Sequence, residues 1–358
     1  MIPYWLMFLL PAYLALVAHP VTARNKDGTL RGSIDGAWLF IAITLTVLIG
    51  FRFNVGGDWL NYLRHYEFMD GKDYATALTK SEFSHWAINK LMRDLELGFT
   101  GVNVLYAFLF AVGFIAFARV QPRPWLVLAS SVPYLIIVVA MGYSRQAVAL
   151  GFAFIGLVAL RRGYFIRFSL WVLLGASFHS SAVFLIPLAG LAVDRNRIQA
   201  IAGVGLITIL GYELLLAKNI TRLFDTYIDQ VLTTSDGALI RLSMNALAAL
   251  IFLYYRRLFN LTPSEFRLWS INSILALLML GAFFSLGFST ALDRMALYLI
   301  PLQLVTVAHL PDALGVPGRR NTVGVAIVLA YFFAVNFVWL NFASHAHLWL
   351  PYQIGLIQ

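Results

Sequence analysis

Long apolar runs alternate with short polar clusters along the whole chain. The longer runs have roughly 16 to 23 residues, which at ~1.5 Å per helical residue is enough to cross a ~30 Å hydrocarbon core. Several runs are shorter, and those near Arg145 and His179 are separated by few polar residues. We therefore expect some helices to end within the membrane thickness, beside a polar cavity. The pattern predicts twelve helical spans, over residues 2–19, 36–51, 101–117, 125–142, 146–160, 166–178, 181–193, 199–217, 239–255, 268–290, 295–310 and 322–342.

The composition agrees with this pattern and excludes a soluble globule. Hydrophobic residues make up 60% of the 358 residues and charged residues only 12%, against about a quarter charged in ordinary soluble domains. The first apolar run follows Met1 without a basic segment, so we predict a retained helix rather than a cleaved signal peptide. The predicted fold class is an all-α polytopic integral membrane protein, with a single transmembrane domain over residues 1–358.

The distribution of basic residues predicts the orientation of these spans. If the spans alternate in direction, 15 of the 26 basic residues and five of the 17 acidic residues fall on one side, giving +10, and the other side carries −1. The positive side is expected to face the cytoplasm. Both termini and the long connection over residues 52–100 would then lie outside.

The second half of this long connection predicts a helix. Residues 81–96 place Phe83, Trp86 and Leu91 near one helical face, as in a helix that lies in the membrane interface. Two interpretations remain open: a cap over the helical bundle, or a lid that positions a substrate. A connection of this length in a chain of otherwise shorter links favours a functional role.

Missing motifs exclude several classes of function. The chain has no cysteine, no HExxH, no GxGxxG and no GxxxxGK[ST], so a redox or nucleotide-driven machine is not expected. The net charge of +9 comes from residues scattered among loops, which indicates membrane topology rather than nucleic-acid binding. No cofactor and no metal ion are predicted.

Four arginines break the charge rule, because Arg52, Arg145, Arg241 and Arg294 all fall at the outward ends of apolar runs. Any one alone is explained by a snorkelling anchor or by pairing with a nearby acid, such as Asp293 beside Arg294 or Asp58 near Arg52. Four together predict a receptor for phosphate oxygens, because guanidinium groups hold a permanent charge and bind in bidentate geometry.

Two short polar segments lie beside these arginines. In the first, Gly56 and Gly57 permit positive φ angles, and Asp58 either caps the next helix or has a functional role. In the second, His179 lies among serine residues at the mouth of two short apolar runs, where a lone histidine is otherwise a satisfied packing group. This clustering favours a functional His179.

The order of these segments resembles the EpsG family of bacterial exopolysaccharide proteins, which are similar to O-antigen polymerases of the Wzy type. The resemblance covers roughly residues 35 to 300. It rests on Arg52-Phe-Asn-Val-Gly-Gly-Asp58-Trp-Leu-Asn-Tyr62, Ser81-Glu82-Phe83, Ser144-Arg145-Gln146-Ala147 and Phe178-His179-Ser180-Ser181.

The resemblance implies a GT-C-like glycosyltransferase in the bacterial inner membrane, active at its extracytoplasmic face. The implied partners are a polyprenyl-diphosphate-linked oligosaccharide, membrane lipid and a chain-length regulator, with no nucleic acid among them. The sugar, its linkage and the stereochemical outcome are not predicted.

Polymerisation of such a glycan sets two chemical demands. The departing diphosphate must be stabilised, and Arg145 and Arg294 are the preferred residues, followed by Arg52 and Arg241. The acceptor hydroxyl must lose a proton, and the candidate catalytic residues are His179, Asp58 and Glu82. His179 ranks first because its ordinary pKa suits work near neutrality, and Asp58 would alternatively orient an arginine.

Other functions remain as alternatives. An O-antigen ligase would use the same chemistry on a different acceptor, and a flippase for lipid-linked saccharides also needs a cationic cavity. A transporter requires polar residues through the full membrane depth, whereas the unexpected charges here gather outward. This favours an enzyme, and acyl transfer has weaker support because only one histidine without a paired acid motif is present.

Overall fold

The described part of the chain is a helical bundle with a small helical crown at one end. The computed structural model describes residues 1–33, 35–188, 237–286 and 289–355, together with positions 203, 205 and 209. Within these ranges the regular elements are all helical, and extended residues pair only in two isolated bridges. The helices of the bundle are α1 (Ile2–Val17), α2 (Gly36–Gly50), α6 (Gly98–Ala118), α7 (Pro124–Ser131), η1 (Val132–Ala140), α8 (Ser144–Leu160), α9 (Phe165–Ala176), η2 (Ser180–Leu185), α13 (Ala238–Tyr255), α14 (Pro263–Leu286), α15 (Ser289–Ala296), η4 (Leu297–Leu299), α16 (Ile300–Ala313) and α17 (Thr322–Phe342).

The predicted spans within the described residues are helical. Five helical segments have the length and apolar composition to cross a membrane, and five further apolar helices have 10 to 17 residues, as the short runs predicted. The predicted span 181–193 is described as far as residue 188, and of the span 199–217 only positions 203, 205 and 209 are described. The described residues are thus those of a polytopic helical membrane protein.

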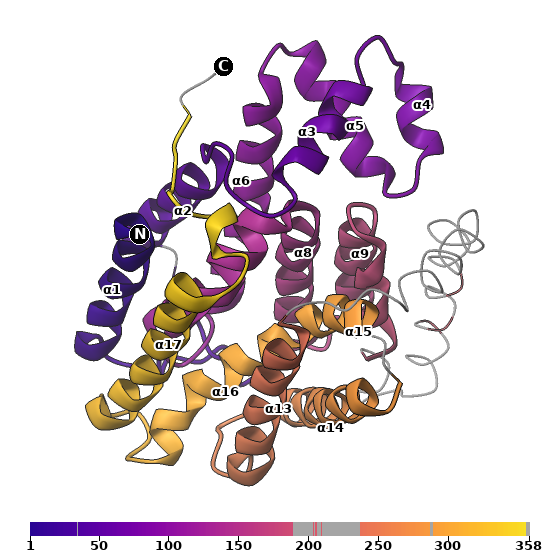
Figure 1. The fold of residues 1–358 in the computed structure, drawn as a ribbon. Helices are drawn as coiled ribbons and strands as arrows, with labels where there is room; N and C mark the ends of the chain where they lie inside the picture. Colours follow the sequence, from indigo (N-terminus) through magenta and orange to yellow (C-terminus); the bar gives the residue numbers. More distant parts are fainter. Residues whose placement is uncertain are drawn as a thin grey trace.

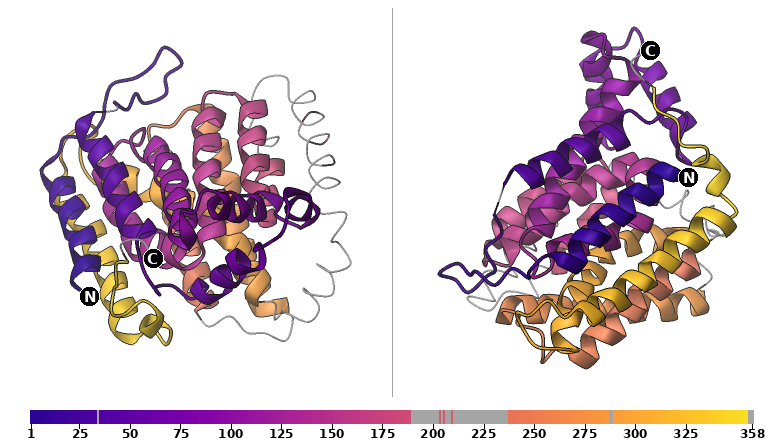
Figure 2. Two further views of the ribbon diagram at one scale, coloured as in Figure 1. Left: turned by 90° about the horizontal axis from the view of Figure 1, so that it is seen from above. Right: turned by 90° about the vertical axis from the view of Figure 1, so that its left-hand side faces the viewer.

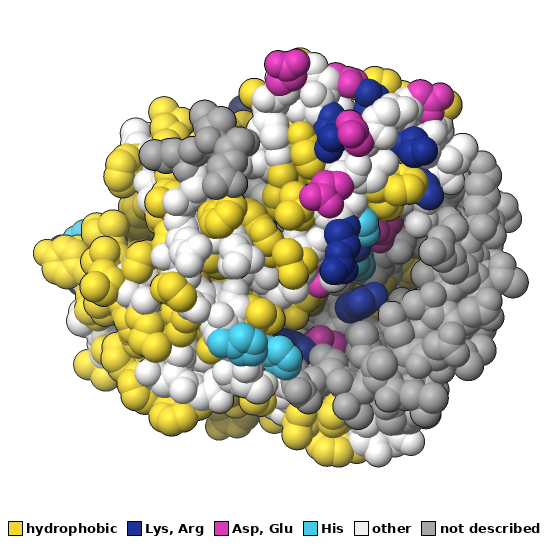
Figure 3. Space-filling view, turned by 45° about the horizontal axis from the view of Figure 1, so that its top comes forward, with side chains coloured by type: hydrophobic (Ala, Val, Ile, Leu, Met, Phe, Trp, Pro, Cys, Tyr) yellow, Lys and Arg dark blue, Asp and Glu magenta, His cyan; other side chains and the backbone are white. Residues whose placement is uncertain are grey.

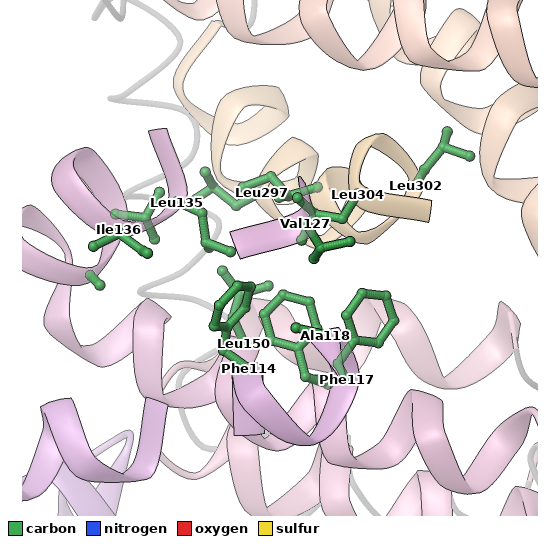
Figure 4. Packing of buried hydrophobic residues seen from close by; sticks show 14 of the residues in the cluster. Phe114, Phe117, Ala118, Val127, Leu135, Ile136, Leu150, Leu297, Leu302 and Leu304 are labelled. Atoms are coloured by element: carbon green, nitrogen blue, oxygen red, sulfur yellow. The ribbon is translucent and has the colours of Figure 1, made fainter. Parts of the chain in front are cut away.

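The bundle is built from two groups of helices. In the first group α2 packs on α6, α6 on α8 and α8 on α9, and in the second α13 packs on both α14 and α16. Helix α7 joins the groups because it contacts both α6 and α16. The two groups lie side by side in Figures 1 and 2. Figure 4 shows Val127 of α7 between Leu304 on one side and Phe114 and Phe117 on the other.

Close backbone contact holds the first group together. A Cβ atom on Gly113 of α6 would lie only 2.0 Å from the carbonyl oxygen of Gly151 in α8. No side chain fits at this crossing, and small residues of this kind allow membrane helices to pack backbone against backbone.

The crown is formed by the long connection over residues 52–100. It contains α3 (Trp59–Phe68), α4 (Tyr74–Thr79) and α5 (Phe83–Asp94), which stand above one end of the bundle (Figure 1). We call this end the loop side. Tyr4 in α1 donates a hydrogen bond to the carbonyl oxygen of Trp349 at 2.7 Å, so segments near both ends of the chain meet here, as the predicted orientation requires.

Helix α5 lies where the sequence predicted an amphipathic helix, but a polar face is the one it buries. His85, Asn89 and Met92 are buried, whereas Leu91 and Leu95 are exposed. The polar face is buried because it finds hydrogen-bond partners in the protein, and the exposed leucines leave an apolar face for the membrane interface.

The C-terminal segment after α17 returns to the loop side and fixes the turn before α3. The indole N–H of Trp349 donates to the carbonyl oxygen of Ile137 at 2.8 Å, and the Gly56 N–H donates to that of Leu348 at 2.9 Å. Gly56 has φ +112°, and a Cβ atom there would lie 2.2 Å from the carbonyl oxygen of Met141. Glycine is therefore required where this turn crosses the end of η1.

Candidate functional site

The candidate site lies on the loop side, where α8 begins beneath the crown. It collects Arg145 from the first turn of α8, Asp58 from the start of α3, Glu82 from the start of α5 and His179 from the link between α9 and η2. Basic, acidic and histidine side chains gather beside a hollow on this face (Figure 3). Residues far apart in the sequence thus meet at the loop-side ends of their helices.

Arg145 and Glu82 form an ion pair at the centre of the site. The second oxygen of the Glu82 carboxylate, Oε1, accepts a hydrogen bond from the Ser180 backbone N–H at 3.0 Å. The guanidinium carbon of Arg145 lies 5.4 Å from the centre of the Tyr62 ring, in a cation–π contact. Glu82 therefore connects α5, α8 and η2.

The backbone of Glu82 adopts a conformation that non-glycine residues seldom take. Its φ of +56° and ψ of 46° place it in the left-handed region, at a cost of about 1–3 kcal/mol. Burial raises the pKa of the Glu82 carboxyl, but His179, Arg145 and the Ser180 hydrogen bonds outweigh it, so the pKa is lowered overall. The result is a permanently ionised carboxylate that holds Arg145 in place.

His179 is held in one orientation by a hydrogen-bonded chain. Its Nδ1 lies 2.6 Å from the Ser181 hydroxyl, which in turn donates to the Tyr298 hydroxyl at 3.3 Å. Burial lowers the pKa of His179, the charges of Arg145 and Arg294 lower it further, and Glu82 partly offsets them. The imidazole is therefore neutral at physiological pH and can accept a proton.

Asp58 occupies the N-cap position of α3, but its side chain makes no capping hydrogen bond. Oδ1 accepts a weak hydrogen bond from the Asn61 amide at 3.4 Å. Burial raises the pKa of Asp58, whereas the charges of Arg145 and Arg294 act in the opposite direction. Asp58 is thus a half-buried carboxyl group that belongs to the same electrostatic cluster as His179.

The remaining three arginines have different surroundings. Arg294 is exposed and forms no hydrogen bond or ion pair with the described residues, although its charge acts on both Asp58 and His179. Asp293 does not pair with its neighbour Arg294 as the sequence suggested; it forms a bidentate ion pair with Arg241 of α13. Arg241, not Arg294, is therefore the arginine that Asp293 neutralises.

The side chain of Arg52 is buried and donates hydrogen bonds to backbone carbonyl groups, which separates it from the other arginines. Its side chain is 3% exposed and does not pair with Asp58. Nε donates to the carbonyl oxygen of Met141 at 2.9 Å, and NH2 donates to the Ser144 hydroxyl at 2.8 Å and to the Asn103 side chain at 3.2 Å. These contacts fix the position of Ser144, the residue before Arg145.

The family model described as EpsG matches residues 37–354, nearly the whole chain. The chain belongs to the EpsG family. The match confirms the resemblance that the sequence segments indicated and extends it through α17 and the C-terminal segment. Neither a curated protein nor a solved structure matches the chain significantly. As an EpsG family member, the protein is an exopolysaccharide-related membrane protein.

Several residues of this EpsG protein join the site without having been predicted. Tyr62 lies within a segment already singled out, and its ring at the site could have been suspected from its place one turn after Asp58. Tyr298 gave no signal, because nothing in its apolar surroundings distinguishes it. Within the described residues, no group of three His, Cys, Asp or Glu side chains forms a metal site.

A second histidine cluster supports the crown of the EpsG protein. His65 and His85 lie 3.0 Å apart between Nδ1 and Nε2, and His85 Nδ1 lies 2.8 Å from the Tyr106 hydroxyl in α6. Burial lowers the pKa of both histidines, and the charge of Arg145 adds to this effect. Two neutral imidazoles thus anchor α3 and α5 to the bundle close to Arg145.

Proposed function

We propose that this EpsG protein is a polysaccharide polymerase, a glycosyltransferase that joins polyprenyl-diphosphate-linked oligosaccharide repeat units. It would act at the outer face of the bacterial inner membrane, with twelve spans in a GT-C-like arrangement. The observation that carries the proposal is the meeting of His179, Asp58, Arg145 and the exposed Arg294 on the loop side. A base and cations at one membrane face are what glycosyl transfer from a lipid diphosphate requires.

In the proposed step, an acceptor sugar hydroxyl attacks the anomeric carbon of the donor. The hydroxyl proton passes to the free Nε2 of His179, the new C–O bond forms, and the bond between the anomeric carbon and the diphosphate oxygen breaks. The electron pair of that bond leaves with polyprenyl diphosphate. Arg145 and Arg294 stabilise the negative charge that grows on the departing oxygens.

The other residues take supporting roles in this proposal. Glu82 is committed to Arg145 and to the Ser180 N–H, so it orients the cation rather than accepting the proton. Arg241 contacts the diphosphate at the edge of the site, beside Asp293. Arg52, whose donors are already occupied, holds the start of α8.

A flippase for lipid-linked saccharides is the alternative from another class. Alternating access needs polar groups through the membrane depth, whereas the described ion pairs of the site lie at the loop-side ends of the helices and the core between the helices is largely apolar, as around Phe114 and Leu150 (Figure 4). A ligase differs from a polymerase only in its acceptor. The test must therefore identify the product.

The deciding experiment uses purified protein in liposomes with a radiolabelled lipid-linked repeat unit as the sole substrate. We expect a ladder of lipid-linked oligomers and the release of one polyprenyl diphosphate per bond formed. A product that appears only when a lipid A core acceptor is added would indicate a ligase. Movement of the repeat unit between leaflets without any oligomer would indicate a flippase.

The proposed orientation has its own test in intact cells. Lys72→Cys in the crown and Arg162→Cys after α8 introduce single thiols at exposed positions of a cysteine-free chain. An impermeant maleimide should label only the Lys72→Cys variant. Labelling at position 162 instead would place the candidate site in the cytoplasm and contradict the proposal.

A further inference from the structure

A cavity of about 910 Å³ adjoins the candidate site and extends into the apolar part of the bundle. Its walls come from η1, α13, α17 and the C-terminal segment. Gly57, Tyr143 and Arg241 contribute to its lining, and Gly57 and Tyr143 directly precede Asp58 and α8. The cavity therefore begins where the charged residues gather.

The depth of the cavity follows from the helix that lines it. Tyr331, Val335, Val338 and Phe342 of α17 all line it, and their spacing places them on one helical face. From residue 331 to residue 342 a helix rises by about 16 Å. This is about half of a ~30 Å hydrocarbon core, as deep as one leaflet of a bilayer.

The rim of the cavity is apolar and open towards the membrane. Ile240 is 65% exposed, Val338 53% and Phe342 71%, although all three line the cavity. Large apolar side chains at membrane depth remain exposed where they contact lipid rather than water. A hydrocarbon chain can enter sideways through this rim, whereas a sugar would find few hydrogen-bond partners along the walls.

The loop-side end of the cavity is polar. Arg241 lies there with its partner Asp293, and Tyr143 is close enough to interact with the charges of Asp58 and Arg294. The hydroxyl of Tyr134, another lining residue, is buried and has no hydrogen-bond partner among the residues that the structure describes. An unpaired buried hydroxyl is unfavourable, so a ligand oxygen at this position would satisfy it.

We propose that this cavity holds the isoprenoid tail of the donor polyprenyl diphosphate, with the diphosphate at the end formed by Arg241 and Tyr134. The inference rests on the proposed function and adds the location of the lipid. Arg241 and Arg294 together with Asp293 leave a net positive charge at this end, which complements a diphosphate, and the apolar length beneath it complements a tail that lies in one leaflet. The leaving group would thus keep its tail in the cavity while its oxygens face Arg145 and Arg294.

The test uses a short-chain polyprenyl diphosphate with a benzophenone at the far end of the tail. After irradiation of the intact purified protein, peptide mapping should locate the cross-link on α13, α17 or η1. Unlabelled polyprenyl diphosphate should compete, and phosphatidylglycerol at the same concentration should not. Equal competition by phosphatidylglycerol, or cross-links confined to other helices, would overturn the inference.

A matched pair of variants locates the tail within the protein. Ala334→Trp fills the cavity, whereas Ala326→Trp adds the same side chain to an exposed position two turns away on α17 that does not line it. We expect cross-linking to fall about tenfold in Ala334→Trp only, because lost apolar contacts weaken binding. Equal thermal midpoints of the two proteins would exclude misfolding, and unchanged cross-linking in Ala334→Trp would contradict the site.

The cross-linking readout needs no turnover, so it separates the two proposals. Specific cross-linking without any polymer product would retain the lipid site and refute the polymerase. Polymerisation by a protein that cross-links elsewhere would refute the lipid site alone.

Discussion

Charged residues gather at both ends of the bundle, but the two ends use them differently. On the side opposite the crown, Arg123 pairs with Asp312 at 2.6 Å, and Arg161 pairs with Glu265 at 2.9 Å. Arg123 also donates to the carbonyl oxygens of Arg319 and Arg320, both at 2.8 Å. These side chains connect loops to helices.

The arginine side chains at the two ends of the bundle differ in their exposure. The side chains of Arg123 and Arg161 are 4% and 8% exposed, whereas that of Arg145 is 23% exposed and Arg294 is open to its surroundings. Arg123 and Arg161 are buried against their partners and have little surface left for a ligand. A cation that is held in place but partly uncovered can bind an anion. On the loop side Arg145 is such a cation and lies beside Asp58 and His179, whereas the half-exposed Arg162 at the opposite end pairs with Asp27 at 3.9 Å.

The two ends also differ in their histidines. His309 in α16 hydrogen-bonds to the carbonyl oxygen of Val305 and stacks on Phe259 with 5.3 Å between ring centres. His179 lies in the field of Arg145, Arg294 and Glu82. A buried packing histidine and a half-buried candidate base in one protein thus provide a matched pair.

Replacing each of the two histidines in turn should give the largest difference in polymerisation rate between the two ends. We expect His179→Ala to lower the polymerisation rate by roughly 10²- to 10⁴-fold, because the proposed base is lost. His309→Ala should lower membrane abundance while the rate per molecule stays near that of the wild type. Polymer formation by purified His179→Ala at the wild-type rate would remove this residue from the mechanism.

Arginine-to-lysine changes should sharpen the contrast between the cations. Arg145→Lys keeps the charge but loses the bidentate fork, which should cost about 2 to 4 kcal/mol in the barrier, or roughly 30- to 1000-fold in rate. Arg123→Lys should instead reduce thermal stability without a change in rate. Initial rates at equal protein concentration measure the difference. Full activity of Arg145→Lys would show that Arg145 only anchors the end of α8 at the membrane interface.

The pH dependence of kcat/KM should identify the base. Because burial, Arg145 and Arg294 lower the pKa of His179, the proposed base stays deprotonated below the ordinary histidine value of ~6.5, and activity should fall only at lower pH. Burial raises the pKa of Asp58, so its titration shifts towards the same range from the other direction. Asp58→Asn should leave the acid limb in place; loss of that limb would assign the base to Asp58.

The smallest effect on catalysis is expected at the opposite end. Glu265→Gln leaves Arg161 buried without its counter-charge, which should lower stability by about 3–5 kcal/mol. The rate per folded molecule should not change, because no contact links this pair to the site. A reduced rate at unchanged stability would show that both ends take part in turnover.

The sequence determined the class and the family of the protein. The length of the apolar runs predicted where the helices lie along the chain, because a helix needs a minimum number of residues to cross a hydrocarbon core. The arginines that break the charge rule pointed to the loop side, and the order of four short segments gave the EpsG family. These properties depend on residue type and spacing along the chain.

Only the tertiary structure decided which of these residues act together. Asp293 pairs with Arg241 rather than with its neighbour Arg294, and Arg52 turns into the backbone rather than towards a ligand. Helix α5 buries His85 because His65 of α3 and Tyr106 of α6 meet it there. Long side chains can reach several partners, and helix packing, which is absent from local sequence, selects the one that leaves the fewest polar groups unpaired.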